Sequence, residues 1–181
     1  LVNASRQVVT GDQLNANDDG VQMLIEQNLM TSLRVSQIFA KRMIKQAEGG
    51  NGETPAGSII NLSSIAARRF QPKLLAYSVS SAALDQMTRA LAVVLAPHRI
   101  RVNAIAFGSV MSASLKAALD GNNGMRNEIV SSTPLGRIAS PTELAEVAQF
   151  LASEGSDFVT GQILTADGGR TLVDGPDAPA H

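Results

Sequence analysis

Two hydroxyl side chains are spaced so that they could act together in acid–base chemistry. Ser64 ends the β-branched run SIINLSS, and Tyr77 begins an Ala- and Leu-rich stretch thirteen residues later. A hydroxyl at a strand end and a phenol at the start of the next helix can converge at the edge of a parallel sheet, where ligands bind. Taken singly, Ser64 would more simply bond the backbone, and Tyr77 would pack as a half-buried residue.

The residue inventory leaves few other candidates for proton transfer. The sequence has no cysteine, which excludes a thiolate nucleophile, a disulfide and a cysteine-ligated metal, and we predict no metal site. Of the two histidines, His181 is the last residue, and His98 lies in a PHR turn where a solvated side chain is the simpler interpretation. Tyr77, the single tyrosine, and the carboxylates remain.

The elements that must position these side chains alternate between helix and strand, as judged from apolar spacing and cap signals. This alternation predicts an α/β fold with a doubly wound parallel sheet. We expect a single domain over residues 1–181, with a tail that frays over 170–181. The expected elements are helices at residues 19–46, 77–95 and 140–153, strands at 58–64, 100–106 and GQILTADGG, and one or two short helices between 113 and 130.

Composition excludes several classes of partner. The net charge is −1 and aromatic residues are 3% of the chain, so neither a phosphate-binding surface nor a base-stacking platform is expected, and nucleic acid is not a predicted partner. No apolar run approaches the roughly eighteen residues that span a bilayer, so no membrane partner is predicted. The absence of cysteine fits a reducing compartment, and we expect a cytoplasmic location.

A longer series of motifs carries a family resemblance. The segments VNAS, EQNLM, NLSS, AYSVSS, RIRVNAIAFGSVMS, PLGRIASPTELAEVAQFLAS and VTGQILTADGG follow one another over nearly the whole chain. Their order and spacing resemble those of the short-chain dehydrogenase/reductase family. The resemblance implies a Rossmann-like sheet that begins at the family's fourth strand, so that the amino-terminal side of the sheet and its dinucleotide motif would precede Leu1.

The resemblance also implies roles for individual residues. Tyr77 would exchange a proton with a carbonyl or alcohol oxygen, Ser64 would polarise that oxygen, and Asn28 would hold a water in the proton path. The implied cofactor is NADP or NAD, and the implied substrate is a small carbonyl compound or alcohol. Besides Tyr77, the residues implied to bind the cofactor are Asn3, Ala4, Phe107, Gly108, Val110 and Ser112.

One position departs from the family pattern. The family tyrosine is followed four residues later by a lysine, which lies one helical turn away, lowers the pKa of the phenol and binds the nicotinamide ribose. Position 81 is serine here, and Lys73 on the preceding loop is interpreted as a solvated surface residue. Two functions therefore stay open: a ketone reductase similar to 3-oxoacyl-[acyl-carrier-protein] reductases, and a catalytically impaired homologue that binds nucleotide for regulation or assembly.

Assembly is predicted from the two long helices. The segments 19–46 and 77–95 carry apolar residues on more of their circumference than one sheet can cover. We therefore expect a homodimer or homotetramer, as in family members that pair these helices between subunits.

Position 81 supports a first testable prediction. On the sequence alone, Ser81→Lys should raise activity, and more for alcohol oxidation than for ketone reduction, because a cation one turn from Tyr77 favours the phenolate. A substitute cation or a water chain in the native protein would reverse this result, because the added lysine would crowd that arrangement and lower turnover. Rates in both directions from about pH 6 to 10 distinguish the two outcomes.

Overall fold

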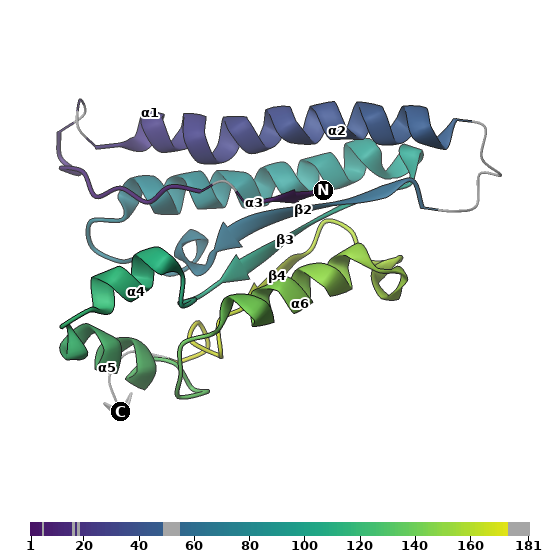
Figure 1. The fold of residues 1–181 in the computed structure, drawn as a ribbon. Helices are drawn as coiled ribbons and strands as arrows, with labels where there is room; N and C mark the ends of the chain where they lie inside the picture. The colour runs from purple at the N-terminus through teal and green to yellow at the C-terminus, as the bar shows by residue number, and fades with distance from the viewer. Residues whose placement is uncertain (5, 16, 18, 49–54, 174–181) are drawn as a thin grey trace, which may run out of the picture.

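The computed structural model describes residues 1–4, 6–15, 17, 19–48 and 55–173. Its strands form one parallel sheet in the order β1-β2-β3-β4 (Figure 1). Helices cover both faces of this sheet, which confirms the predicted α/β class and the doubly wound, Rossmann-like arrangement. The strands are β1 (Val2–Asn3), β2 (Gly57–Ser64), β3 (Ile100–Phe107) and β4 (Ile163–Ala166).

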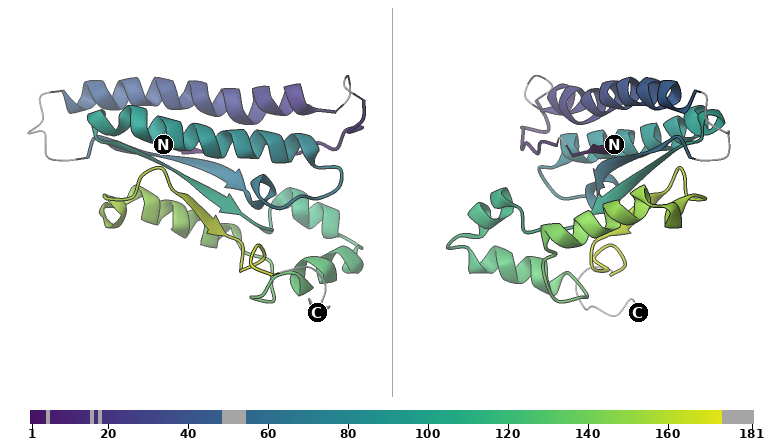
Figure 2. Two further views of the ribbon diagram at one scale, coloured as in Figure 1. Left: turned by 180° about the vertical axis from the view of Figure 1, so that it is seen from behind. Right: turned by 45° about the vertical axis from the view of Figure 1, so that its right-hand side comes forward.

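The helices divide between the two faces. The rod formed by α1, the π-helical turn η1 and α2 lies beside α3 on one face, and α6 lies on the other (Figures 1 and 2). Two short helices, α4 and α5, lie beyond the carboxyl ends of the strands. The α- and π-helices are α1 (Val21–Leu24), η1 (Ile25–Met30), α2 (Thr31–Ala47), α3 (Leu75–Leu95), α4 (Ala113–Leu119), α5 (Asn123–Ser131) and α6 (Pro141–Ala152). The single-turn 3₁₀ helices are η2 (Ile65–Ala67), η3 (Ala96–His98) and η4 (Glu154–Ser156).

The central strand β2 contributes to two apolar clusters because successive side chains of a strand point to opposite faces. Ile59 packs with Ala40 and Ala92 on the side of α2 and α3. Its neighbour Ile60 packs with Leu151 on the side of α6. Both isoleucines are fully buried, so β2 holds the two helical layers together.

Buried amides connect the layers on the side of α2 and α3. The Asn3 side chain donates to Asn61 Oδ1 at 2.8 Å and to Ser36 Oγ at 3.0 Å. Asn61 in turn donates to Thr88 Oγ1 at 2.9 Å. All four side chains are buried, where an unpaired polar group is costly, so these bonds fix β1 and β2 against α2 and α3.

The predicted elements are present, with boundaries that differ by a few residues. α3 begins at Leu75 instead of residue 77. The first predicted helix contains the π-helical turn η1, which the apolar spacing did not reveal. Residues 170–173 of the tail follow β4 in a turn, and residues 174–181 lie outside the described part of the chain.

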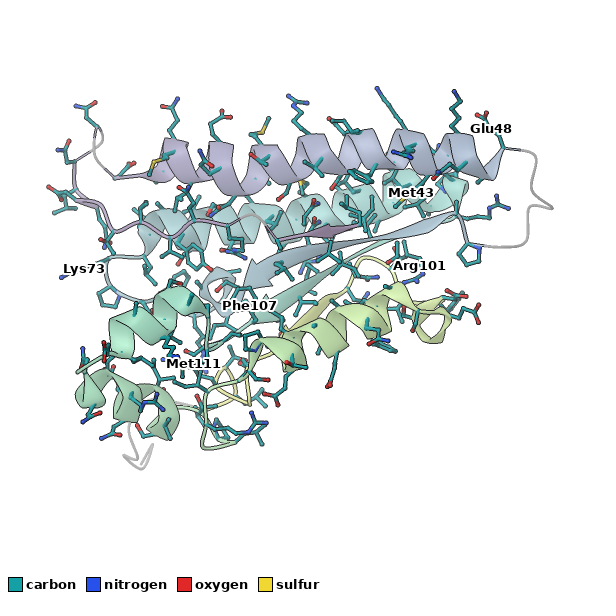
Figure 3. All side chains as sticks on the ribbon, viewed as in Figure 1. Met43, Glu48, Lys73, Arg101, Phe107 and Met111 are labelled. Atoms are coloured by element: carbon teal, nitrogen blue, oxygen red, sulfur yellow. The ribbon has the colours of Figure 1, made fainter. Side chains whose placement is uncertain are left out.

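Two residues set aside on the sequence are exposed in the structure. His98 is exposed in η3, at the far end of α3 from Tyr77. Lys73 is exposed on the loop before α3 (Figure 3). Within the described residues, no three His, Asp or Glu side chains gather as metal ligands do, and no helix is long and apolar enough to cross a membrane.

A capping box opens α6. Ser140 Oγ accepts from the Glu143 backbone, and Glu143 Oε2 accepts from the Ser140 backbone at 2.8 Å. Arg137 donates to both Glu143 carboxylate oxygens, at 2.6 and 2.7 Å. The hydrogen bond from Arg137, followed by the one from the Ser140 backbone, lowers the pKa of Glu143 from 4.5 to about 2. Ionised Glu143 therefore stabilises the start of this helix.

The lowered pKa gives a pH-dependent stability. Because the pKa of Glu143 is lower in the folded protein than its ordinary value of 4.5, the contribution is complete above that value and is lost as the pH falls toward about 2. Glu143→Gln should therefore flatten the dependence of the unfolding free energy on pH in this acid range. Denaturant unfolding at a series of pH values measures this effect. Glu146→Gln, at an exposed position of the same helix, is the matched control, and an equal flattening there would contradict the assignment.

Candidate active site

A cavity of about 430 Å³ opens at the carboxyl ends of β2 and β3. Four residues predicted from the sequence line it: Ser64, Tyr77, Phe107 and Gly108. Ser64 and Phe107 are paired in the parallel register of β2 and β3, so the two strand ends lie side by side. Figure 3 shows Phe107 at the end of β3. The structure therefore brings the hydroxyl and the phenol to one space, as their spacing had suggested.

Local structure positions both hydroxyl groups. The chain turns directly after β2, and Ser64 Oγ accepts from the Ala66 backbone at the start of η2. The hydroxyl hydrogen of Ser64 remains available to a ligand. The Tyr77 ring is buried against Leu24 and Ala76, and its hydroxyl forms no hydrogen bond with any described residue. Both groups can therefore donate to a molecule in the cavity.

The side chain of Arg6 lies directly against this site. Its guanidinium carbon is 4.8 Å from the centroid of the Tyr77 ring and 5.7 Å from that of Phe107. Nη1 donates to the Leu62 carbonyl at 2.6 Å, and Nη2 donates to Ser81 Oγ at 2.9 Å. Sequence reasoning missed Arg6 because it lies in a stretch without helical or strand periodicity. The available signal was its position directly after the VNAS strand end.

The face of α3 behind the cavity carries three polar groups at four-residue spacing. Tyr77, Ser81 and Asp85 therefore lie on one side of the helix. Ser81 is fully buried, and Asp85 accepts a short hydrogen bond from Ser63. Burial raises the pKa of the Asp85 carboxyl, and the Ser63 hydrogen bond partly opposes this. Burial likewise lowers the pKa of Arg6, while the nearby Tyr77 and Asp85 charges oppose the change. The arrangement places a half-buried cation near two groups that can be anionic.

Asn28 holds the segment that carries Arg6. Its side chain accepts from the Gln7 backbone N–H at 2.8 Å and donates to the Gln7 carbonyl at 2.9 Å. A longer bond of 3.4 Å reaches Ser80 Oγ. Asn28 lies in the π-helical turn η1, a feature that is frequent at functional sites. All contacts described for the Asn28 amide are thus with other residues of the protein. Its expected role in holding a water of the proton path stays a prediction.

The remaining predicted residues are spread around the strand ends. Asn3 is buried in the amide network, and Ala4 is exposed at the end of β1. Val110 forms an isolated bridge to Ala139, and Ser112 caps α4 by accepting from the Leu115 backbone. None of these four side chains lines the cavity with Tyr77. Their roles toward a cofactor stay predictions.

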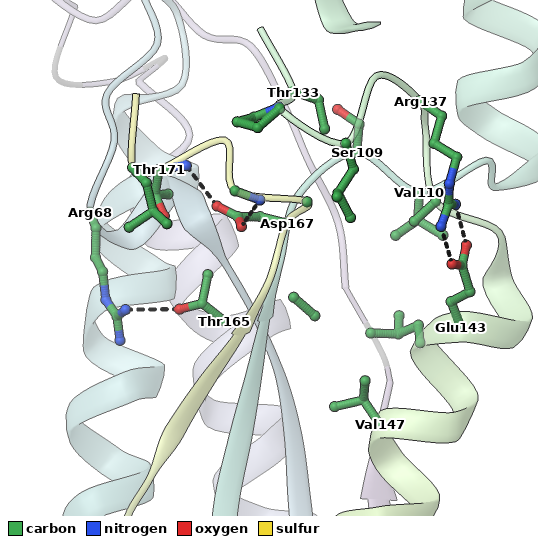
Figure 4. A pocket seen from close by; sticks show the side chains of 18 residues that line it. Arg68, Ser109, Val110, Thr133, Arg137, Glu143, Val147, Thr165, Asp167 and Thr171 are labelled. Carbon is green, nitrogen blue, oxygen red and sulfur yellow. Dashed lines mark hydrogen bonds and ion pairs between the residues drawn. The ribbon is translucent and has the colours of Figure 1, made fainter. Parts of the chain in front are cut away.

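A larger cavity, of about 690 Å³, lies between β4, α6 and the loops beside them (Figure 4). It contains neither Ser64 nor Tyr77, and its charged side chains are already bonded. Arg137 pairs with Glu143, and Arg68 donates to Thr165 at 3.0 Å. Asp167 accepts from backbone N–H groups of its own turn. Because Ser64 and Tyr77 both line the smaller cavity, we assign the site to that cavity.

Comparisons with known proteins agree with this geometry. Residues 2–171 match the family model described as enoyl-(acyl carrier protein) reductase. The chain is 36% identical over 146 residues to the 3-oxoacyl-[acyl-carrier-protein] reductase FabG of Chlamydia trachomatis, which covers 81% of this chain and 54% of the relative. It is also 36% identical to FabG of Thermotoga maritima over 149 residues, 82% of this chain and 56% of that protein. The chain thus spans about half the length of these relatives.

Solved structures show the same relationship. A gluconate 5-dehydrogenase from Burkholderia cenocepacia, in complex with NADP and tartrate, superposes with a TM-score of 0.84 at 29% identity, over 96% of this chain and 65% of that one. An acetoin dehydrogenase from Enterobacter cloacae gives 0.81 at 26% identity, over 99% of this chain and 66% of the other. With the family model covering nearly all of its length, the chain belongs to the short-chain dehydrogenase/reductase family.

Proposed function

We propose that this protein is an NADP- or NAD-dependent oxidoreductase that interconverts a ketone and an alcohol. The observation that carries the proposal is the convergence of Ser64 and Tyr77, from two different elements, on one cavity at the strand ends. Neither hydroxyl hydrogen is donated to a described residue. Both hydroxyl groups line a space that a small substrate could fill. Family membership supports the same chemistry, because matched relatives are reductases and dehydrogenases.

In the reducing direction, Tyr77 donates its phenolic proton to the carbonyl oxygen as that oxygen gains negative charge. Ser64 donates a hydrogen bond to the same oxygen and stabilises the developing charge. In the oxidising direction, deprotonated Tyr77 accepts the proton of the alcohol. The packing of the Tyr77 ring against Leu24 and Ala76 holds the phenol in place, so little reorganisation is required.

The residues present fit the nicotinamide end of the cofactor. Phe107 offers a flat apolar wall in the cavity that holds both hydroxyls, and Val8 and Ile65 add apolar lining. When bound, the cofactor supplies or accepts the hydride. Following the family pattern, we assign the segment with Gly108, Val110 and Ser112 to the nicotinamide carboxamide, and Asn3 and Ala4 to the adenosine ribose. Two matched structures bear NADP in their descriptions, which supports NADP as the first cofactor to test.

We propose a 3-oxoacyl thioester or a similar small ketone as substrate, because several matched relatives are 3-oxoacyl-[acyl-carrier-protein] reductases. The direct test mixes the intact protein with NADPH or NADH and a panel of ketones, and follows loss of the reduced nicotinamide absorbance. Turnover supports the enzyme. Cofactor binding without turnover of any ketone or alcohol supports the second candidate, a nucleotide-binding homologue, which the serine at position 81 favours.

The role of Tyr77 is tested by Tyr77→Phe. The substitution removes the proton donor and little buried area, so turnover should fall by about a hundredfold or more while cofactor affinity stays nearly unchanged. Steady-state rates and nucleotide fluorescence titrations measure the two effects. Ser132→Ala, which alters another hydroxyl at the same cavity, is the matched control and should retain turnover. A Tyr77→Phe variant with more than a few per cent of parental turnover would place the acid elsewhere.

We also propose a homodimer or homotetramer formed through α2 and α3. Ile38 is 65% exposed and Phe39 40% exposed on α2, while Val79 is 41% exposed on α3. Such apolar side chains on adjacent helices suit an isologous contact with a second copy. Light scattering of the intact protein at micromolar concentration should give at least twice the subunit mass, and Ile38→Asp should lower it. A parental mass of one subunit would contradict the proposal.

A further inference from the structure

Positions 6 and 81 are 75 residues apart in the sequence and in direct contact in the fold. At position 81, where the family pattern calls for a lysine, the chain has a serine, which carries no charge. The guanidinium of Arg6 fills this place from the other side and donates to the Ser81 hydroxyl at 2.9 Å. A cation from position 6 thus lies beside position 81.

The guanidinium is held in a defined orientation. The Leu62 carbonyl fixes Nη1, Ser81 fixes Nη2, and the central carbon of the group lies near the rings of Tyr77 and Phe107. The Nε atom is buried and has no hydrogen-bond partner among the described residues. Water therefore screens this charge poorly, and a poorly screened cation acts strongly on a neighbouring phenol. Asn28 fixes the adjacent Gln7 backbone, which restrains the segment from the other end.

Other charged groups near the cavity are engaged elsewhere. Arg69 lines it but donates to the carbonyls of Thr171 and Val173, at 2.6 and 2.9 Å. Arg170 also lines it and donates to Ser109 Oγ at 2.9 Å. The charged groups that act on one another along this face of α3 are Arg6, Arg68, Asp85 and Arg89.

We propose that Arg6 is the cation that serves Tyr77 in place of the family lysine at position 81. In this role it is a positioning residue, because it acts through the phenol: its charge stabilises the phenolate and so eases proton transfer between Tyr77 and the substrate oxygen. The catalytic role of Arg6 rests on the proposed function, whereas its electrostatic effect on Tyr77 does not. It also reverses the result expected for Ser81→Lys from the sequence, because the added ammonium would collide with Arg6 and repel it.

The experiment uses a readout that needs no cofactor. The ultraviolet absorbance of phenolate is followed during a pH titration of the intact protein, and subtraction of the same titration of Tyr77→Phe isolates the signal of Tyr77. Arg6→Met should move the pH midpoint of this signal upward by about one to three pH units, since it removes an opposite charge within a few ångströms. Arg6→Lys, which keeps the charge, should stay close to the parent.

The reciprocal exchange gives the sharpest test. The double variant Arg6→Met/Ser81→Lys returns the cation to the family position, so its titration midpoint and its alcohol oxidation profile should come back toward those of the parent. Ser81→Lys alone should lower turnover. Circular dichroism verifies that each variant is folded. If Arg6→Met does not fold, the double variant still tests the proposal. A phenolate midpoint of the double variant well above that of the parent would overturn it.

Failure of this inference is distinguishable from failure of the proposed function. A folded Arg6→Met with an unchanged phenolate midpoint overturns the role of Arg6, whatever the turnover. If Arg6→Met shifts the phenolate midpoint but the parent reduces no ketone, the result supports the electrostatic pairing and contradicts the proposed reaction. In a parent that does reduce a ketone, equal turnover in the parent, Arg6→Met and the double variant would also overturn the role.

Discussion

The parallel pairing of β2 with β3 is the constraint on which the rest of the site depends. The two strands pair continuously from Gly57 with Ile100 to Ser64 with Phe107. Since both strands run in the same direction, their last residues reach one edge of the sheet together, and β4 places Ala166 beside Phe107 at the same edge. A register slip of one residue would turn every side chain of β2 to the opposite face. It would exchange Ile59 with Ile60 in the core and turn Ser64 away from the cavity.

The sequence was sufficient to predict the elements that are defined by local patterns. The β-branched run before Ser64, the capping residues of α6 and the apolar spacing of the long helices each report on residues a few positions apart, and the structure confirms these elements. The convergence of Ser64 and Tyr77 was predictable for a related reason. Parallel strands and the helices between them have few permitted arrangements, so their ends meet at a known edge.

The sequence could not reveal the contacts between distant segments that complete the site. Arg6 lies in a stretch without periodic spacing, and nothing local indicates that it crosses to Ser81 on α3. The same is true of the pairing between Asn28 and the Gln7 backbone. Such contacts depend on how an irregular loop returns over the sheet, and a residue pattern does not encode that path. Position 81 alone therefore gave an incomplete view of the charge around Tyr77.

The π-helical turn η1 fixes how many residues the rod of α1, η1 and α2 can contain while keeping one face buried. Leu24, Asn28, Ser32 and Ser36 are buried at a strict four-residue spacing. In a regular α-helix this spacing drifts by about 40° at every step, whereas a π-helical turn takes more residues per revolution and absorbs part of the drift. The helix can thus keep one face toward Tyr77 at its start and toward Asn3 farther along. Loss of a single residue within η1 would rotate all of α2 by about 100° about its axis. Insertions and deletions in this stretch should consequently be far rarer among related chains than substitutions on its outer surface.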